Sequence, residues 1–167
     1  MLKYFIILIF IITSFQSFAQ DYKIIADEDK GEPLILGYCP VILLNDSLFD
    51  GRWTSEYNSY DLDYGVLDSL VGKLDSINII IVFRSTCSDS REQLPRLFKI
   101  FNKLKYNVNT ITLIGVDREK QGLSDEAEGF GIEFVPTIIF YKDGNEIGRI
   151  VEIPEESLEL DLLKILS

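Results

Sequence analysis

The chain has 167 residues, with 16 basic and 27 acidic side chains, a formal net charge of −11 and no histidine. This acidity argues against nucleic acid or an anionic membrane surface as a partner, because both attract positively charged proteins. Histidine-based catalysis and histidine metal ligation are excluded. The two cysteines, Cys39 and Cys87, are far apart in the chain and lack the companions that a zinc site needs. We therefore expect neither a metal nor another cofactor.

The first residues have the layout of a signal peptide, which we expect to span residues 1–19. Lys3 precedes an apolar run from Phe5 to Ile12, and the small residues Ser17 and Ala19 precede the expected cleavage point. The alternative is an uncleaved anchor, but polar residues interrupt the run before the ~20 apolar residues that span a bilayer. We expect an exported, periplasmic or secreted protein that leaves the membrane after cleavage and has the length of one domain. Its oligomeric state is not predicted.

Residues 20–65 are expected to form an N-terminal extension that packs on the core. Short apolar runs predict a strand around residues 34–36 and a short strand or extended segment at residues 41–44. Trp53, Tyr57 and Tyr60 follow at helical spacing and would share one face of a helix. That aromatic face would pack on the core or, alternatively, line a ligand groove.

Residues 66–167 alternate between helical and strand patterns. A helix over residues 66–74, capped by Asp61 or Asp63, precedes a central strand at residues 77–83. An amphipathic helix follows Cys87 and contains Pro95, which should kink it. A second buried strand at residues 110–116 would pair with the first in parallel, because the helix between them makes a crossover connection.

The last third of the chain contains a hairpin signal. The segment at residues 124–128 is long enough for one or two helical turns. Asp143-Gly144 separates two runs rich in β-branched and aromatic residues, which predicts antiparallel strands joined by a tight turn. A leucine-rich amphipathic helix follows Pro154 and ends the chain.

Cys87 is the leading candidate for a reactive group. It stands where a buried strand passes into a helix, so its sulfur would face the free amides and positive dipole end of that helix. These features favour the thiolate, which is the attacking species in disulfide exchange. Its neighbours Ser85, Thr86, Ser88 and Asp89 are polar and fit a surface loop. The alternative is an inert buried cysteine.

The order of these features resembles the thioredoxin family. The resemblance is carried by the strand before Cys87-Ser88-Asp89-Ser90, the helix with Pro95, the run Val135-Pro136-Thr137 and the final hairpin and helix. It implies an α/β three-layer fold for residues 66–167, with a central mixed sheet flanked by helices. The extension, with Gly37-Tyr38-Cys39, is similar to that of exported Bacteroidetes-type members.

The resemblance also implies roles for individual residues. Cys87 would be the nucleophile, and Ser90 would occupy the position of the resolving cysteine, where it can only hydrogen-bond the thiolate. Pro136 would be the family's cis-proline, with the Val135 backbone pairing to an extended substrate. We assign Thr86 and Thr137, their neighbours, to substrate contact as well. The expected partners are protein thiols or disulfides.

The sequence departs from the family at several positions, and two functions stay open. Thr86 replaces the usual tryptophan, Ile81 replaces a buried acid, and Asp89 would either oppose thiolate formation or cap the helix. One function is thiol–disulfide exchange with a single cysteine, completed by Cys39 as a distant resolving thiol or by an external thiol. The other is a redox-silent module that binds an extended segment, with Cys39 a buried free thiol.

Overall fold

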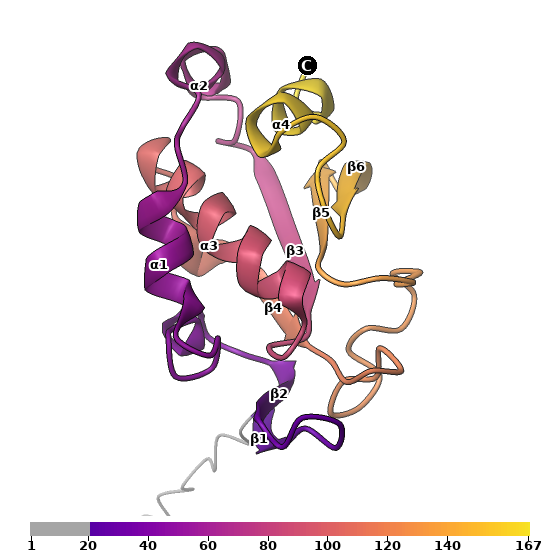
Figure 1. The fold of residues 1–167 in the computed structure, drawn as a ribbon. Helices are drawn as coiled ribbons and strands as arrows, with labels where there is room; N and C mark the ends of the chain where they lie inside the picture. Colours follow the sequence, from indigo (N-terminus) through magenta and orange to yellow (C-terminus); the bar gives the residue numbers. More distant parts are fainter. Residues whose placement is uncertain (1–20) are drawn as a thin grey trace, which may run out of the picture.

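The computed structural model describes residues 21–167, so the expected signal peptide lies outside the described residues (Figure 1). The strands are β1 (Tyr22–Ala26), β2 (Pro33–Tyr38), β3 (Ile77–Phe83), β4 (Thr112–Gly115), β5 (Thr137–Lys142) and β6 (Asn145–Val151). The α-helices are α1 (Arg52–Ser59), α2 (Tyr64–Leu70), α3 (Ser88–Lys103) and α4 (Leu158–Ile165). None of the helices described is long and apolar enough to cross a membrane.

The six strands form one mixed sheet in the order β1-β2-β4-β3-β5-β6. β3 lies at its centre, parallel to β4 and antiparallel to β5, as its unbroken run of β-branched residues predicted. The predicted hairpin is confirmed, because β5 and β6 pair antiparallel around Asp143 and Gly144, whose φ angles are 50° and 81°. Positive φ at both positions is what a two-residue hairpin turn requires.

The N-terminal extension contributes two strands to the sheet, where the sequence predicted one. β1 and β2 form an antiparallel hairpin, and β2 pairs with the end of β4. Gly115 of β4 faces Gly37 of β2, and a Cβ atom on Gly115 would lie 2.4 Å from the Ile35 carbonyl oxygen. The absence of a side chain at position 115 therefore lets the hairpin approach β4 closely.

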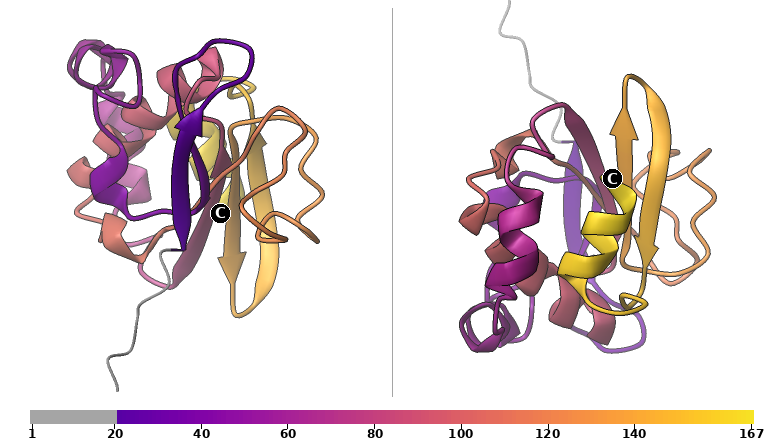
Figure 2. Two further views of the ribbon diagram at one scale, coloured as in Figure 1. Left: turned by 90° about the horizontal axis from the view of Figure 1, so that it is seen from below. Right: turned by 90° about the horizontal axis from the view of Figure 1, so that it is seen from above.

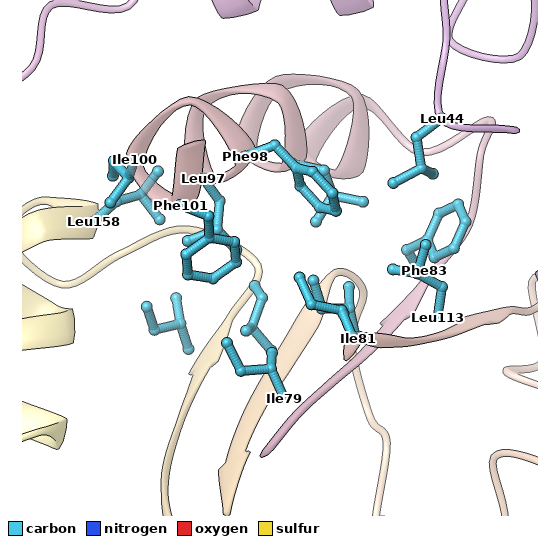
Figure 3. Packing of buried hydrophobic residues seen from close by; sticks show 14 of the residues in the cluster. Leu44, Ile79, Ile81, Phe83, Leu97, Phe98, Ile100, Phe101, Leu113 and Leu158 are labelled. Atoms are coloured by element: carbon cyan, nitrogen blue, oxygen red, sulfur yellow. The ribbon is translucent and has the colours of Figure 1, made fainter. Parts of the chain in front are cut away.

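The sheet separates two apolar clusters. Ile79, Ile81 and Phe83 of β3 face the helices and form the larger cluster with residues of α3 such as Leu97 and Phe101 (Figure 3). The alternate residues of β3 face the other side, where the segment between β4 and β5 covers them. The two views in Figure 2 agree that the helices lie on one side of the sheet and this segment on the other. The structure therefore has three layers, which are the helices, the sheet and the segment between β4 and β5.

The aromatic stripe of α1 packs on the core. The Trp53 ring lies 5.0 Å from that of Phe49 and 5.4 Å from that of Phe98. The Tyr60 hydroxyl donates to the carboxylate of Glu159 at 2.6 Å, and burial together with Glu159 raises the pKa of Tyr60. These contacts fix α1 against α3 and α4, so the alternative of a ligand groove lined by the stripe is not supported.

Three local predictions differ from the structure. Residues 41–43 form a short 3-10 helix instead of the predicted short strand or extended segment, because Pro40 begins a tight turn in which the Leu43 N–H donates to the Pro40 carbonyl oxygen. The segment at residues 124–128 forms turns without a helix, since it offers little apolar surface beyond Ala127. α2 ends at Leu70, ahead of Gly72 with its φ of 75°, and Asp63 caps its start.

Candidate active site

Cys87 lies where β3 passes into α3. It is the N-cap residue of α3, with extended backbone angles of −78° and 135°, and its side chain is partly exposed. The thiol donates to the Val135 carbonyl oxygen, with Sγ 3.3 Å away. The Val135–Pro136 peptide bond is cis. The structure therefore brings together the cysteine loop and the proline loop, which are far apart in the sequence.

A shallow groove of about 260 Å³ surrounds the sulfur. Phe134 is 49% exposed and contributes an apolar surface beside Val135. Among the described residues, the Val135 N–H has no hydrogen-bond acceptor, since pairing of β5 begins at Thr137. Val135 thus offers a free N–H to an extended segment. The Val135 carbonyl oxygen accepts a hydrogen bond only from the Cys87 thiol among the described residues.

The structure buries the side chains of Thr86 and Thr137, the two threonines that we assigned to substrate contact. Thr86 is fully buried, and its hydroxyl donates to the Asp27 carboxylate at 2.6 Å. Thr137 is also buried, and its hydroxyl donates to the Phe134 carbonyl oxygen at 2.7 Å. Both hydroxyls are used inside the protein, although Thr86 is among the residues that line the groove.

Ser90 does not hold the sulfur in this structure. Its hydroxyl is fully buried one turn into α3 and has no hydrogen-bond partner among the described residues. The expected hydrogen bond to the Cys87 sulfur is therefore not formed, because the thiol is turned toward Val135. An unpartnered buried hydroxyl remains at the position where the resemblance implies a resolving cysteine.

Cys39 is a buried free thiol. It follows β2, and its N–H donates to the Leu113 carbonyl oxygen at 3.0 Å. Its side chain belongs to the larger apolar cluster, while Cys87 contacts the smaller one. Burial raises the pKa of Cys39 to about 12, so the thiol stays protonated at neutral pH. This structure does not support the role of a resolving thiol for Cys39.

Mild oxidation of the native protein should not join the two cysteines. An internal disulfide would lower the intact mass by two hydrogens. After diamide treatment and alkylation, we expect no such decrease, because Cys39 is enclosed by the core. The same treatment in denaturant serves as the control and should allow pairing. An internal disulfide formed under native conditions would contradict the position of Cys39 described above.

A buried carboxylate, which the sequence analysis missed, anchors the cysteine loop. The Asp27 side chain is completely buried in the turn between β1 and β2. It accepts hydrogen bonds from the Thr86 hydroxyl, from Arg84 at 2.6 and 3.0 Å, and from the N–H groups of Asp29 and Lys30. One side chain thus ties the N-terminal hairpin to the residue before Cys87.

The donors around Asp27 determine its charge. Burial alone would raise its pKa, but the hydrogen bonds from Thr86, Arg84 and the two backbone N–H groups outweigh burial and hold the pKa at about 2. Asp27 is therefore ionised at neutral pH and compensates Arg84. The hairpin is held to the cysteine loop by a charge-assisted network.

Further contacts fix the loop from α3 and from β2. Arg91 is buried, donates to the Ser85 carbonyl oxygen at 2.7 Å and forms an ion pair with Glu32. The Ser85 hydroxyl donates to the Pro33 carbonyl oxygen and accepts from the Ile35 N–H of β2. Arginines beside a buried strand and on the buried side of a helix need acidic partners, but the sequence does not say which acids.

The site residues offer no ready place for a metal. Within residues 21–167, no cluster of three or more cysteine or acidic side chains is arranged to hold one.

The central strand that leads to a cysteine at a helix N-terminus, opposite a cis-proline, defines a protein of the thioredoxin fold.

Comparisons with known proteins agree with this class. The thioredoxin family model matches residues 65–164, which is more than half of the chain, and the chain belongs to the thioredoxin family. It is 28% identical to a thioredoxin of Chlamydia pneumoniae over 85 residues, which cover 51% of this chain and 78% of that protein. No solved structure gives a significant match. The matched range begins after α1, so β1, β2 and α1 lie outside it.

Proposed function

We propose that this protein carries out thiol–disulfide exchange on exported proteins, with Cys87 as its single reactive cysteine. The observation that carries the proposal is the partly exposed Cys87 thiol at the N-terminus of α3, in contact with the Val135 carbonyl oxygen. Residues 1–19 act as a signal peptide in this proposal, and the protein works in the periplasm or outside the cell. The extension is that of a Bacteroidetes-type member.

The proposed reaction has two exchange steps. In the first, the Cys87 thiolate attacks one sulfur of a partner disulfide; that S–S bond breaks, a mixed disulfide with Cys87 forms, and the second partner sulfur leaves as a thiolate that takes up a proton. In the second, an external thiolate attacks the partner sulfur of the mixed disulfide. Cys87 is released as a thiolate, and the external thiol becomes joined to the partner.

The residues around Cys87 support the first step. The Cys87 sulfur is partly exposed at the N-terminus of α3, so a partner disulfide can approach it. Once ionised, Cys87 no longer donates to Val135, so the Val135 carbonyl oxygen is free to accept from a partner N–H. Together with the free Val135 N–H, it can pair with an extended partner segment in the manner of a strand.

An external thiol is needed for the second step because the chain offers no internal one. Ser90 stands where a resolving cysteine would attack, and a hydroxyl cannot reduce a disulfide at neutral pH. Cys39 is buried and protonated. The proposal therefore includes a small or protein thiol as the second substrate.

An exchange assay tests the proposed function. A peptide mixed disulfide and an excess of a small thiol are incubated with the protein, and the released peptide thiol is measured against the uncatalysed rate. Wild type should exceed the background, Cys87→Ser should fall to it, and Cys39→Ala should retain the wild-type excess. A Cys87→Ser variant as active as wild type would contradict the proposal.

One observation favours a second candidate function, a redox-silent module that binds extended segments. Ile81, in the place of the family's buried acid, is completely buried among apolar residues, so position 81 supplies no carboxylate to shuttle a proton. Such a module would leave the exchange rate at the background in wild type and in Cys87→Ser. Both proteins would still bind the same peptide, which fluorescence anisotropy would measure.

A further inference from the structure

The groove around Cys87 differs in charge from the rest of the chain. Four cationic side chains line it, against the two acids Asp117 and Glu152, although the whole chain has 16 basic and 27 acidic residues. The four are Lys30, Arg84, Arg118 and Lys120. They come from the β1–β2 turn, the end of β3 and the loop after β4. The lining of the groove is therefore richer in cationic than in acidic side chains, unlike the chain as a whole.

Two of these cations are already compensated. Arg84 pairs with Asp27 at 2.6 Å and with Asp29 at 3.2 Å, and Arg118 pairs with Asp29 at 3.2 Å. These arginines line the groove, and their bonds to Asp27 and Asp29 fix the turn that contains Lys30. They contribute little free charge to a ligand.

The two lysines remain available. Among the described residues, neither Lys30 nor Lys120 forms an ion pair. The exposed Lys30 ammonium donates to the Thr86 carbonyl oxygen at 2.6 Å, which places its charge beside the residue that precedes Cys87. An ammonium with one backbone partner retains two further donors. The two lysines can therefore receive carboxylates from a ligand whose sulfur lies at Cys87.

We propose that the Cys87 groove selects thiols and disulfides carried on acidic peptide segments, with Lys30 and Lys120 as the specificity-determining residues. This inference rests on the proposed function and names its substrate class. The partner segment lies along Phe134 and Val135, where Phe134 contacts its apolar part and the Val135 backbone pairs with its main chain. Acidic residues next to the partner cysteine then meet the two lysines. A partner with basic flanks is disfavoured by the same charges.

Two matched peptides test this inference. Both carry one cysteine activated as a thiopyridyl disulfide; glutamate flanks the cysteine in one and glutamine in the other. Attack by the Cys87 thiolate joins the peptide to Cys87 and releases pyridine-2-thione, whose absorbance gives the rate constant. Wild type at low salt should react about tenfold faster with the acidic peptide, because two partly exposed ion pairs contribute modestly and increase the encounter rate. The ratio should fall toward one at high salt.

Charge reversal identifies the residues responsible. The variant Lys30→Glu/Lys120→Glu should lose the preference, with a rate ratio at or below one. Lys73→Glu/Lys142→Glu serves as the matched control, because it makes the same charge change at two exposed positions outside the groove and should keep the wild-type ratio.

Different outcomes contradict the inference and the proposed function. Equal rates with both peptides in wild type, with Cys87 still modified, would overturn the preference for acidic segments and leave the exchange reaction standing. A preference retained in the double variant would overturn the role of the two lysines. If neither peptide modified Cys87, the proposed function would fail, and this inference with it.

Discussion

Replacing Ser90 by cysteine should raise the rate of insulin reduction in the presence of a small thiol by at least about tenfold, because it supplies an internal resolving thiol. Residues three apart in the first turn of a helix lie at a Cα separation of about 5 Å, which a disulfide can bridge. The Ser90 hydroxyl is buried without a partner, so replacing it by sulfur removes no hydrogen bond. The mixed disulfide on Cys87 would then be resolved within the molecule.

The matched control is Ser88→Cys, which adds a thiol at an exposed position one residue from Cys87. It should leave the rate near that of wild type. Side chains of adjacent helical residues do not face each other, so a sulfur at position 88 is poorly placed to attack the mixed disulfide on Cys87. A Ser90→Cys variant with wild-type activity would show that the Cys87 mixed disulfide does not form. An equal gain in Ser88→Cys would show that any nearby thiol suffices.

Replacing Asp27 by asparagine should lower the free energy of unfolding by about 3 kcal/mol, because it leaves the mostly buried Arg84 guanidinium without its closest partner. Asp27 uses one oxygen for Thr86 and Arg84 and the other for the N–H groups of Asp29 and Lys30, so the asparagine NH2 group would face one of these donor sets without accepting from it. Urea denaturation at neutral pH measures the loss. The matched control is Asp29→Asn, whose side chain is 44% exposed and which should cost less than about 1 kcal/mol.

The same carboxylate predicts a pH dependence. Its pKa falls from an ordinary value of 3.8 to about 2 on folding, so the unfolded chain binds the proton more tightly. The stabilisation is fully present above about pH 4 and is lost as the pH falls toward 2. The stability difference between wild type and Asp27→Asn should therefore shrink by roughly 2 kcal/mol over that range. A constant difference down to pH 2 would contradict the charge state assigned to Asp27.

The parts of the fold that follow local patterns could be predicted. The run at residues 77–83 can only be a buried strand, and Asp143-Gly144 specifies a hairpin turn wherever it stands between strands. β1 was missed because it is a sheet edge whose exposed residues break the alternation that marks a strand. The turn at residues 41–43 was mistaken for a strand because short apolar runs occur in both.

The main residues of the site could be predicted from the order of elements along the chain, but the tertiary contacts of the site could not. Cys87, Val135 and Pro136 follow from the order of strand, loop and helix that the family shares. Thr86 and Thr137 were assigned to the substrate because they neighbour these residues, yet neighbours in extended backbone point to opposite sides. Asp27 is more than fifty residues from its partners Arg84 and Thr86, and no periodic pattern links such distant positions.

The rate at which iodoacetamide alkylates each cysteine of the native reduced protein at neutral pH tests the central claim most directly. Cys87 is the one accessible sulfur and the proposed nucleophile, and the hydrogen bonds around Asp27 hold its loop at the amino end of α3. Mass analysis of peptides should find Cys87 alkylated far faster than free N-acetylcysteine, with Cys39 unmodified over the same interval. Alkylation of Cys87 no faster than in the protein unfolded by urea would contradict the account.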